Sequence, residues 1–454
     1  MIRVFSSFRD PSGYVFEENG VMYRTITESY RTHYEALMGT SLYNELTKQR
    51  LLVPHEELSN ARPDCWRMIA PQKIEFISYP FEWSFSQWKD AALLTLNIME
   101  RALKRDMCLK DASAFNIQWY KGKPIFIDTL SFEIREKNGP WAAYGQFCRH
   151  FLAPLLLMAY CDIRLQHLFL HYLDGIPLDL ASKLLPLRTR LKPGILLHIH
   201  IHAGLVTKFG SGMSGGQRSK APGNRDSVPA LIDSLTHLIQ GIKPPLPKTE
   251  WAAYYLNTNY SAAAFESKKS IAERFIEQIH PKRVCDLGAN DGTFSRIAAK
   301  YAKAVISADI DPIAVENNYK QLAKDTSIDI WPVLLDLNNP TSQLGWANQE
   351  WRSFDERCRS DLVMALGLIH HLCISNNLPL SFVAAYLARL AEYAIVEFVP
   401  KSDSNAQRLL SIRTDIFPNY TQEGFESEFG EIYDIVLREQ VKDSPRVIYL
   451  LKKR

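Results

Sequence analysis

Hydrophobic and polar residues alternate in two different ways along this chain. After residue 250, short apolar runs such as RVCDL (283–287) and AVISAD (304–309) alternate with stretches that have helical spacing. Such runs predict buried strands, and their alternation with helices is typical of an α/β fold with a parallel sheet. Before residue 206, helical patterns predominate and strands are few. We therefore predict an α/β C-terminal half and an α+β, mainly helical N-terminal half.

A stretch without apolar periodicity separates the two halves. Residues 209–229, FGSGMSGGQRSKAPGNRDSVP, are dense in Gly, Ser and Pro, which is typical of a linker or loop. The full chain of 454 residues is also longer than one hydrophobic core usually supports. We predict an N-terminal domain at 1–205, a flexible linker with a connecting helix at 206–250, and a second domain at 251–454.

Composition narrows the class of function. The 53 basic and 50 acidic residues leave a formal net charge of +3, too balanced to favour nucleic acid or an anionic membrane, so a small-molecule or protein substrate is expected. The seven cysteines form no CxxC pair, which argues against a disulfide framework or a cysteine zinc site and fits a reducing cytosol. The longest apolar run, FLAPLLLMAYC (151–161), is about half of the roughly 20 residues that span a bilayer. We expect a cytoplasmic protein without a membrane span.

A glycine turn follows the first predicted strand of the C-terminal half. The turn reads DLGANDG (286–292), and Asp309 ends the next strand 21 residues after Gly288. Dinucleotide-binding folds also place an acid about 20 residues after their first glycine. Their G-x-G-x-x-G turn would need glycine at Asn290 and Thr293, which this chain lacks. The Asp-x-Gly-x-x-x-Gly pattern therefore does not favour close approach to a pyrophosphate.

This pattern resembles motif I of the class I S-adenosylmethionine (SAM) dependent methyltransferases, and the resemblance covers essentially residues 251–454. DIWPVLLDLNNP (329–340), SDLVMALGLIHHL (360–372) and AEYAIVEFVP (391–400) are similar to the third, fourth and fifth strands of that family. GEIYDIVLREQVKDSPRVIYLLKK (430–453) resembles its terminal antiparallel hairpin. Three segments, ALGLIHHL, VEFVPKSD and DIFPNYTQEGFESEF, further resemble the nodulation protein NoeA-like branch of bacterial methyltransferases. The resemblance implies a doubly wound, seven-stranded, Rossmann-like sheet and bacterial methyltransferase activity with SAM as cofactor.

The same resemblance implies a set of cofactor-binding residues. Acceptors are needed for the amine and the ribose diol of SAM, and Asp336 holds the position that commonly meets the adenine amino group. The implied cofactor residues are Asp286, Gly288, Asn290, Gly292, Asp309, Ile310, Asp336, Leu337 and Leu366. For Asp286 the alternative is a carboxylate that caps the next helix, for the glycines an ordinary turn, and for Asp336 a solvated loop acid.

Three residues are candidates for catalysis. His370 and His371 follow the fourth predicted strand, and Glu397 ends the fifth. An imidazole titrates near neutral pH and could serve as a general base, although SAM is already activated and a paired histidine could equally pack the loop. We expect an acceptor hydroxyl on a small molecule or saccharide. A SAM-binding scaffold without turnover is the alternative.

The N-terminal half contains a second constellation. In LKDASAFNIQWYKGKPIFIDTLSFE (109–133), Asp111, Asn116 and Asp128 resemble the catalytic loop and metal-binding acid of aminoglycoside and choline kinases. The resemblance implies a site for Mg-ATP and a bifunctional protein. IEFISYPFEW (74–83) would supply the strand and hinge facing adenine, and Arg24 would replace the usual strand lysine. The alternative is a helical recognition domain for the acceptor or a protein partner, in which these acids only occupy loops.

The run HIHIH places His198, His200 and His202 at alternate positions. On a strand the three imidazoles would share one face and could bind a metal, whereas on a helix they would spread around the axis. No carboxylate or cysteine is adjacent, so we predict no metal site.

Overall fold

The computed structural model describes residues 2–58, 62–136, 139–205, 227–245, 261–322, 324, 329–412 and 414–454. The chain forms two compact units, which are described separately below. The first comprises Met1–Leu246 together with Leu344–Trp351, and the second comprises Pro247–Gln343 and Arg352–Arg454. Of the predicted linker, residues 206–226 and 246–250 lie outside the described residues, and most of the rest is a helix of the first unit, α10 (Ser227–Gly241).

The second unit is built on a seven-stranded mixed sheet in the order β12-β11-β10-β13-β14-β16-β15. Its first five strands are parallel, and β16 is antiparallel to both β14 and β15. The strands are β10 (Arg283–Leu287), β11 (Ala304–Asp309), β12 (Ile330–Leu334), β13 (Ser360–Ala365), β14 (Ala391–Phe398), β15 (Tyr433–Gln440) and β16 (Val447–Lys453). The predicted α/β sheet with a terminal antiparallel hairpin is thereby confirmed.

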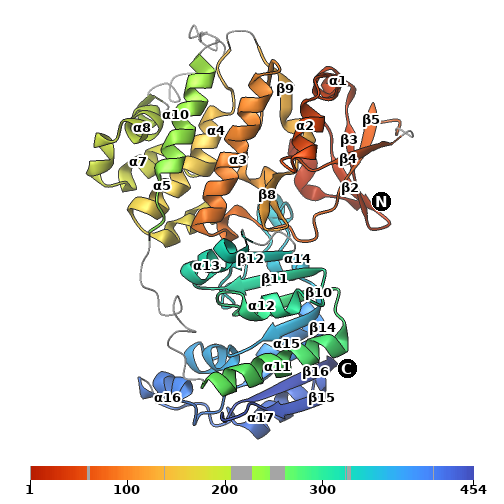
Figure 1. Cartoon of the computed structure of the whole chain (residues 1–454), viewed down its shortest axis with the longest axis vertical. Coiled ribbons are helices and arrows are strands. Elements are labelled where there is room, and N and C mark those ends of the chain that lie inside the picture. Colours follow the sequence, from red (N-terminus) through yellow and green to blue (C-terminus); the bar gives the residue numbers. More distant parts are fainter. Residues whose placement is uncertain are drawn as a thin grey trace. The chain divides into compact units, whose positions relative to one another are not determined.

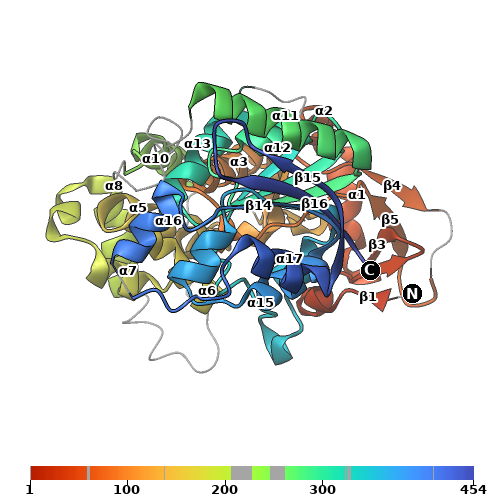
Figure 2. The same cartoon turned by 90° about the horizontal axis from the view of Figure 1, so that it is seen from below.

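Helices cover both faces of this sheet. They are α11 (Ala262–Ile279), α12 (Thr293–Ala298), α13 (Pro312–Leu322), α14 (Phe354–Arg357), α15 (Leu380–Leu390), α16 (Ser404–Ser411) and α17 (Gln422–Gly430). Figure 2 shows α11 and α12 on one side of β14 and β16, with α15 and α17 on the other. Apolar side chains of α11 and α12 pack on β10, β13 and β16 in one buried cluster. Strands covered on both faces must be apolar throughout, which explains the short continuous runs in the sequence.

The register of the sheet aligns the strand ends that matter for the site. Leu287 at the end of β10 pairs with Ala308 of β11 and with Ala365, the last residue of β13. The turn after β10, Asp309 at the end of β11 and the loop after β13 therefore meet at one edge. In open α/β sheets, ligands bind outside the carboxyl ends of the strands where the strand order reverses. In this sheet that point lies between β10 and β13.

The first unit contains a five-stranded antiparallel sheet in the order β1-β2-β3-β5-β4 and two two-stranded ladders, β6 with β9 and β7 with β8. Its strands are β1 (Ile2–Arg3), β2 (Val15–Glu18), β3 (Val21–Ile26), β4 (His55–Leu58), β5 (Arg67–Pro71), β6 (Met107–Leu109), β7 (Ile117–Tyr120), β8 (Lys123–Phe126) and β9 (Phe132–Ile134). Its other helices are α1 (Arg31–Gly39), α2 (Leu42–Lys48), α3 (Phe85–Leu103), α4 (Tyr144–Phe147), α5 (Ala153–Tyr160), α6 (Leu168–His171), α7 (Leu178–Leu184) and α8 (Pro193–Ile195).

The long helix α3 contributes many buried residues to the core of this unit. It begins at a capping box in which Ser84 accepts from the backbone N–H of Gln87 and the Gln87 side chain accepts in return. Its buried residues include Trp88, Leu96 and Met99, and α10 packs against it (Figure 1). A kinase-like fold for this half remains a prediction.

One predicted strand is wrong. Residues 74–79 form no strand, and the strand that precedes α3 is β5 at Arg67–Pro71. The side-chain amide of Gln118 bonds both backbone groups of Ser78, accepting from its N–H at 2.9 Å and donating to its carbonyl at 2.9 Å. The backbone groups of Ser78, within this apolar stretch, are therefore satisfied by a side chain instead of a ladder. Among helices in the described ranges, none combines the length and apolarity needed to cross a bilayer.

Candidate functional site

A pocket of about 260 Å³ lies at the switch point of the seven-stranded sheet. It is formed by the turn after β10, the end of β11, the loop after β12 and the loop after β13. Seven of the predicted cofactor residues line it: Gly288, Asn290, Asp309, Ile310, Asp336, Leu337 and Leu366. The catalytic candidate His371 lines it as well. Residues that sequence reasoning missed complete the lining, among them Lys268, Asn338, Gly367, Leu368, Ser375 and Asn376.

The turn after β10 is tight because of Gly288. Its φ of 70° lies in the left-handed region, and a Cβ there would come within 3.2 Å of Leu368 Cδ1. The backbone N–H groups of Gly288 and Ala289 both donate to the carbonyl of Ala308, which locks the turn onto β11. A side chain at Gly288 would therefore strain the backbone and crowd this end of the pocket.

Asp309 is anchored at the end of β11 by backbone donors. Its Oδ2 accepts from the N–H of Asn290 at 2.7 Å, and its Oδ1 accepts from the N–H of Asp311 at 2.8 Å. The backbone of Ile310 also donates to this carboxylate, and since a carboxylate has about four acceptor positions, acceptor capacity remains for a ligand. Burial raises the pKa of Asp309 from 3.8 to about 6, although these backbone donors oppose the rise.

The other side of the pocket combines an apolar surface with a polar turn. Ile310 is an exposed apolar side chain, 53% accessible, and it lies on the pocket wall. Asp336 accepts from both the backbone N–H and the side-chain amide of Asn338 through Oδ1, at 2.8 and 3.0 Å. This arrangement suits a flat, weakly polar group between Ile310 and Leu337, with a carboxylate at its edge.

Lys268 is a charged residue of the pocket lining that was not predicted from the sequence. It projects from α11, and its Nζ lies 2.7 Å from Glu397 Oε2, with side-chain exposures of 4% and 0%. Arg446 approaches Glu397 at 3.7 Å and pairs with Asp403 at 2.7 Å. A signal was present, because Lys268 interrupts the buried stripe of α11 that contains Ala264, Ile271, Ala272, Phe275 and Ile276. A lysine within an apolar stripe has to find a buried partner.

Asp286 and Gly292 do not line the pocket. The carboxylate of Asp286 accepts from Ser295 Oγ at 2.6 Å, and Ser307 Oγ lies 2.7 Å from the same hydroxyl oxygen. This contact connects β10 to α12, but Asp286 does not cap that helix, whose N-cap is Gly292 without a side-chain cap. A Cβ at Gly292 would clash with the Asn318 side-chain amide. Cofactor contacts by these two residues stay predictions.

The two histidines have different positions. His370 is 1% exposed and does not line the pocket, and neither ring nitrogen has a hydrogen-bond partner within the described residues. Burial holds its pKa well below 6.5. The ring centroid of His371 lies 4.1 Å from that of His370, with the rings tilted by 44°. His371 lines the pocket, and burial lowers its pKa to about 4. Glu397 is fully buried behind Lys268 and does not line the pocket. Their catalytic roles remain untested predictions.

The first unit brings Asp111, Asn116 and Asp128 to one pocket of about 1360 Å³. Asp111 accepts from the Gln146 side chain at 2.7 Å, and burial together with Asp128 raises its pKa. Asp128 accepts from Ser131 Oγ at 2.7 Å and pairs with Arg24 at 3.2 Å. The predicted Mg-ATP site is neither confirmed nor contradicted by this arrangement.

The HIHIH run is helical. His198 and His200 lie in the π-helical segment η9 (Leu196–Ile201), and His202 follows as its C-cap, so the three imidazoles do not share a strand face. His198 bonds Tyr144 and Ser234, His200 bonds Ser182 and Thr189, and His202 stacks on the ring of Tyr144. Within the ranges that the structure describes, no group of three or more His, Cys, Asp or Glu side chains could hold a metal ion.

Comparison with known proteins identifies relatives of the whole chain. No protein-family model matches it. It is 32% identical over 467 residues to the nodulation protein NoeA of Rhizobium meliloti (strain 1021), covering 99% of this chain and 96% of the relative. Among solved structures, the N-methyltransferase NodS from Bradyrhizobium japonicum WM9 covers 42% of this chain and 98% of its own, at 12% identity and a TM-score of 0.32. Magnesium protoporphyrin IX methyltransferase (ChlM) from Synechocystis PCC 6803 covers 45% and 93%, at 17% identity and a TM-score of 0.32.

Proposed function

The chain belongs to the family of the nodulation protein NoeA, and on that premise we propose that its second unit is a SAM-dependent methyltransferase. The observation that carries the proposal is Asp309, which stands at the end of the second strand beside the Gly288 turn. Its carboxylate is held by backbone donors and keeps acceptor capacity for a ligand. That is the acceptor set a vicinal diol requires, such as the ribose of SAM.

The remaining lining residues suit the other parts of this cofactor. The ribose diol would bond Asp309, and the adenine would lie between Ile310 and Leu337 with its amino group toward Asp336. The backbone around Gly288 and Gly367 has no side chain that would obstruct the methionine portion. A Cβ at Gly367 would lie 3.4 Å from Glu397 Oε2 and 3.7 Å from Lys268 Nζ. The residues of the pocket therefore fit the group.

Lys268 adds a charge for the amino-acid end of the cofactor. It is the cation of the pocket lining, and it stands beside Gly367 at the end of β13. An ammonium held by Glu397 in a buried site can donate its other hydrogens to a ligand carboxylate. We assign Lys268 to the cofactor carboxylate.

Bound SAM supplies an activated methyl group that is transferred by in-line displacement, so the chain mainly aligns the acceptor. His371 is the imidazole on the pocket wall, and its lowered pKa keeps it neutral at pH 7 and makes it a weak base. We assign it to holding the loop after β13. The acceptor is proposed to be a hydroxyl of a small molecule or saccharide, because the lining around His371 is neutral apart from Lys268 and the two acids, Asp309 and Asp336.

Calorimetric titration of the full chain with S-adenosylhomocysteine tests the proposal. Saturable binding is expected in the wild type and should be lost in Asp309→Ala and Gly288→Val. Absence of binding by a folded wild-type chain would refute it. Transfer of labelled methyl groups from SAM to components of a cell extract, above the Gly288→Val background, separates an enzyme from a SAM-binding scaffold.

A further inference from the structure

The large pocket of the first unit has no assigned ligand. It has a volume of about 1360 Å³ and is lined entirely by residues of that unit, including the segment Leu344–Trp351. Pockets for small ligands are commonly about 300–1,000 Å³, so this one can take a molecule larger than a single ring. Its lining includes both aromatic rings and a set of carboxylates and amides.

Two tryptophans, Trp346 and Trp351, line the pocket and belong to one short loop. Trp351 stacks on Phe115 with ring centroids 4.1 Å apart, and Trp346 also lines the pocket while remaining 67% exposed. The loop that presents both tryptophans is closed by reciprocal backbone hydrogen bonds between Leu344 and Trp351, each 3.1 Å. Ala347, inside the loop, has a φ of 56°, which is unfavourable for a residue with a Cβ. The fold therefore maintains an exposed indole at a backbone cost.

A second contact fixes the same loop. Glu350 accepts from the backbone N–H of Trp346 at 3.0 Å and forms a two-point ion pair with Arg9, at 2.5 and 3.0 Å. This pair satisfies both charges without a ligand. It holds the loop that presents Trp346 and leaves no free cation at Arg9 for an anionic group.

The polar side chains of the pocket are held in place by hydrogen bonds within the protein. Asp111 accepts from Gln146 at 2.7 Å and from the N–H of Ser113 at 2.9 Å. Asn116 donates to Ser131 at 3.2 Å. Planar carboxylates and amides held in this way can each bond to neighbouring hydroxyl groups of a ligand. Aromatic faces accept the C–H surface of the same ligand through apolar contact.

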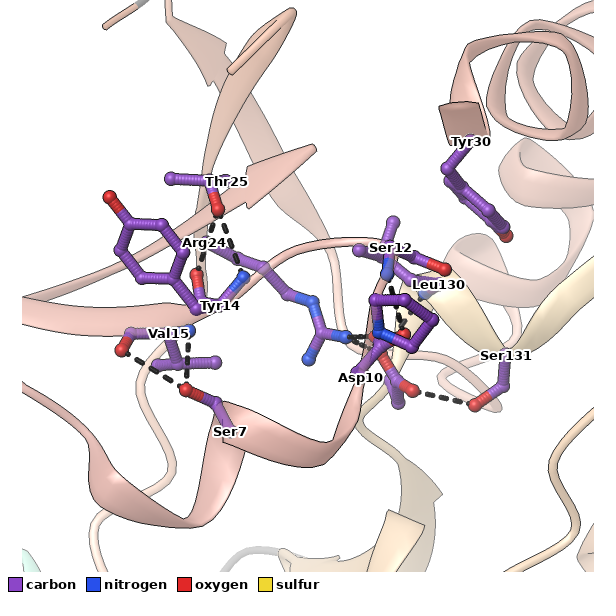
Figure 3. A network of polar contacts seen from close by, with 12 residues as sticks. Ser7, Asp10, Ser12, Tyr14, Val15, Arg24, Thr25, Tyr30, Leu130 and Ser131 are labelled. Atoms are coloured by element: carbon purple, nitrogen blue, oxygen red, sulfur yellow. Dashed lines mark hydrogen bonds and ion pairs between the residues drawn. The ribbon is translucent and has the colours of Figure 1, made fainter. Parts of the chain in front are cut away.

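The charges of the pocket disfavour a polyphosphate. Its lining contains six carboxylates, Asp10, Asp111, Asp128, Asp174, Asp179 and Glu350, against four cations, Arg9, Arg24, Lys110 and Arg149. Arg24, in β3, is already bonded to Asp10 (Figure 3). It also lies 3.2 Å from Asp128. Lys110 donates to Ser12 at 2.6 Å. The excess of carboxylates favours an uncharged or amine-bearing ligand, whereas several phosphates without a divalent cation would be repelled.

We infer that this pocket is a saccharide-binding site, which takes a neutral or amino-bearing oligosaccharide in contact with Trp346 and Trp351 and with Asp111, Asn116 and Gln146. The inference goes beyond the proposed methyl transfer and does not require cofactor binding by the second unit.

Calorimetry and saturation-transfer NMR on the full chain test it with four tetrasaccharide probes: cellotetraose, maltotetraose and the tetramers of N-acetylglucosamine and glucosamine. At least one should bind with a Kd of about 1 mM or tighter. Trp346→Ala should weaken that binding about tenfold, the order expected for losing one aromatic contact. Asp111→Asn should also weaken it. Phe382→Ala removes an aromatic of matched exposure, 68%, from the second unit and should leave it unchanged.

Melting temperature and S-adenosylhomocysteine affinity establish that each variant is folded. Three results would overturn the inference: no saturable binding of any probe by the folded wild type, binding that neither variant weakens, or binding of Mg-ATP in place of saccharide that disappears in Asp128→Asn.

Discussion

Lys268 Nζ lies 2.7 Å from Glu397 Oε2, and both side chains are buried within the second unit. The lysine comes from α11 and the glutamate from β14, and both charged groups approach the Gly367 backbone closely. Burial lowers the pKa of Lys268, and the neighbouring carboxylate opposes that shift. Glu397 therefore helps Lys268 to stay charged at the pocket, although burial favours the neutral amine.

Removal of either partner should destabilise the second unit. Glu397→Gln is expected to lower the free energy of unfolding by about 3–5 kcal/mol, because it removes the buried carboxylate that Lys268 and Arg446 share. Lys268→Met should cost less, because Glu397 keeps Arg446 at 3.7 Å. The double variant should lose less than the sum of the two. Urea denaturation of the full chain, followed at the transition that S-adenosylhomocysteine shifts, measures this. Strictly additive losses would show that the two charges do not interact.

Substitution of Lys268 should affect the binding of S-adenosylhomocysteine and of methylthioadenosine differently. Lys268→Met is expected to weaken S-adenosylhomocysteine binding about ten- to a hundredfold, the loss typical of a charge-assisted hydrogen bond. Binding of methylthioadenosine, which lacks the amino-acid end, should hardly change. Lys269→Met removes the neighbouring, more exposed lysine, which pairs with Glu266, and is the matched control. Equal weakening of both ligands would mean that Lys268 only supports the fold.

Cofactor affinity should depend on the ionisation of Asp309. Its pKa of about 6 is raised by burial, so the carboxylate is protonated below that pH and loses acceptor capacity for the diol. Affinity for S-adenosylhomocysteine should therefore increase as pH rises from about 5 to 7. Asp309→Asn should bind more weakly and show no such increase in calorimetry across this range. The same pH dependence in the Asn variant would assign the titration to another group.

Asp286 should make stability depend on pH. Burial raises its pKa from 3.8 to about 7, so between these values the folded state binds a proton that the unfolded state has released. The free energy of unfolding should therefore fall as pH rises from about 4 to 7. Asp286→Asn can still accept from Ser295 and should flatten this dependence in thermal denaturation. An unchanged slope would contradict the assignment to Asp286.

His371→Gln should leave the chemical step largely intact. His371 is neutral at pH 7 because burial lowers its pKa to about 4, and loss of a true general base would cost roughly a hundredfold or more. We expect a smaller change in methyl transfer from saturating SAM to a cell extract, with a lower melting temperature. A hundredfold loss with unchanged melting temperature and cofactor affinity would make His371 catalytic.

Much of the second unit could be predicted because its signals are local. The run RVCDL coincides with β10, AVISAD with β11, and AEYAIVEF with β14. A strand buried on both faces must be apolar over its whole length, and a turn at positive φ requires glycine. The first unit offered weaker signals. The apolar stretch 74–79 was wrongly predicted as a strand, because Ser78 bonds the side chain of Gln118, 40 residues away, instead of a neighbouring strand.

The sequence by itself determined the strands, the Gly288 turn, and the position of Asp309 at the end of β11, since strand length and turn chemistry depend on neighbouring residues. Only the tertiary structure decided which polar groups are buried together. Lys268 and Glu397 are 129 residues apart, and Arg9 and Glu350 are 341 apart. Pairing over such distances is selected by the closure of the whole fold, because a buried charge is tolerated only where packing brings its partner. No local pattern encodes that partner.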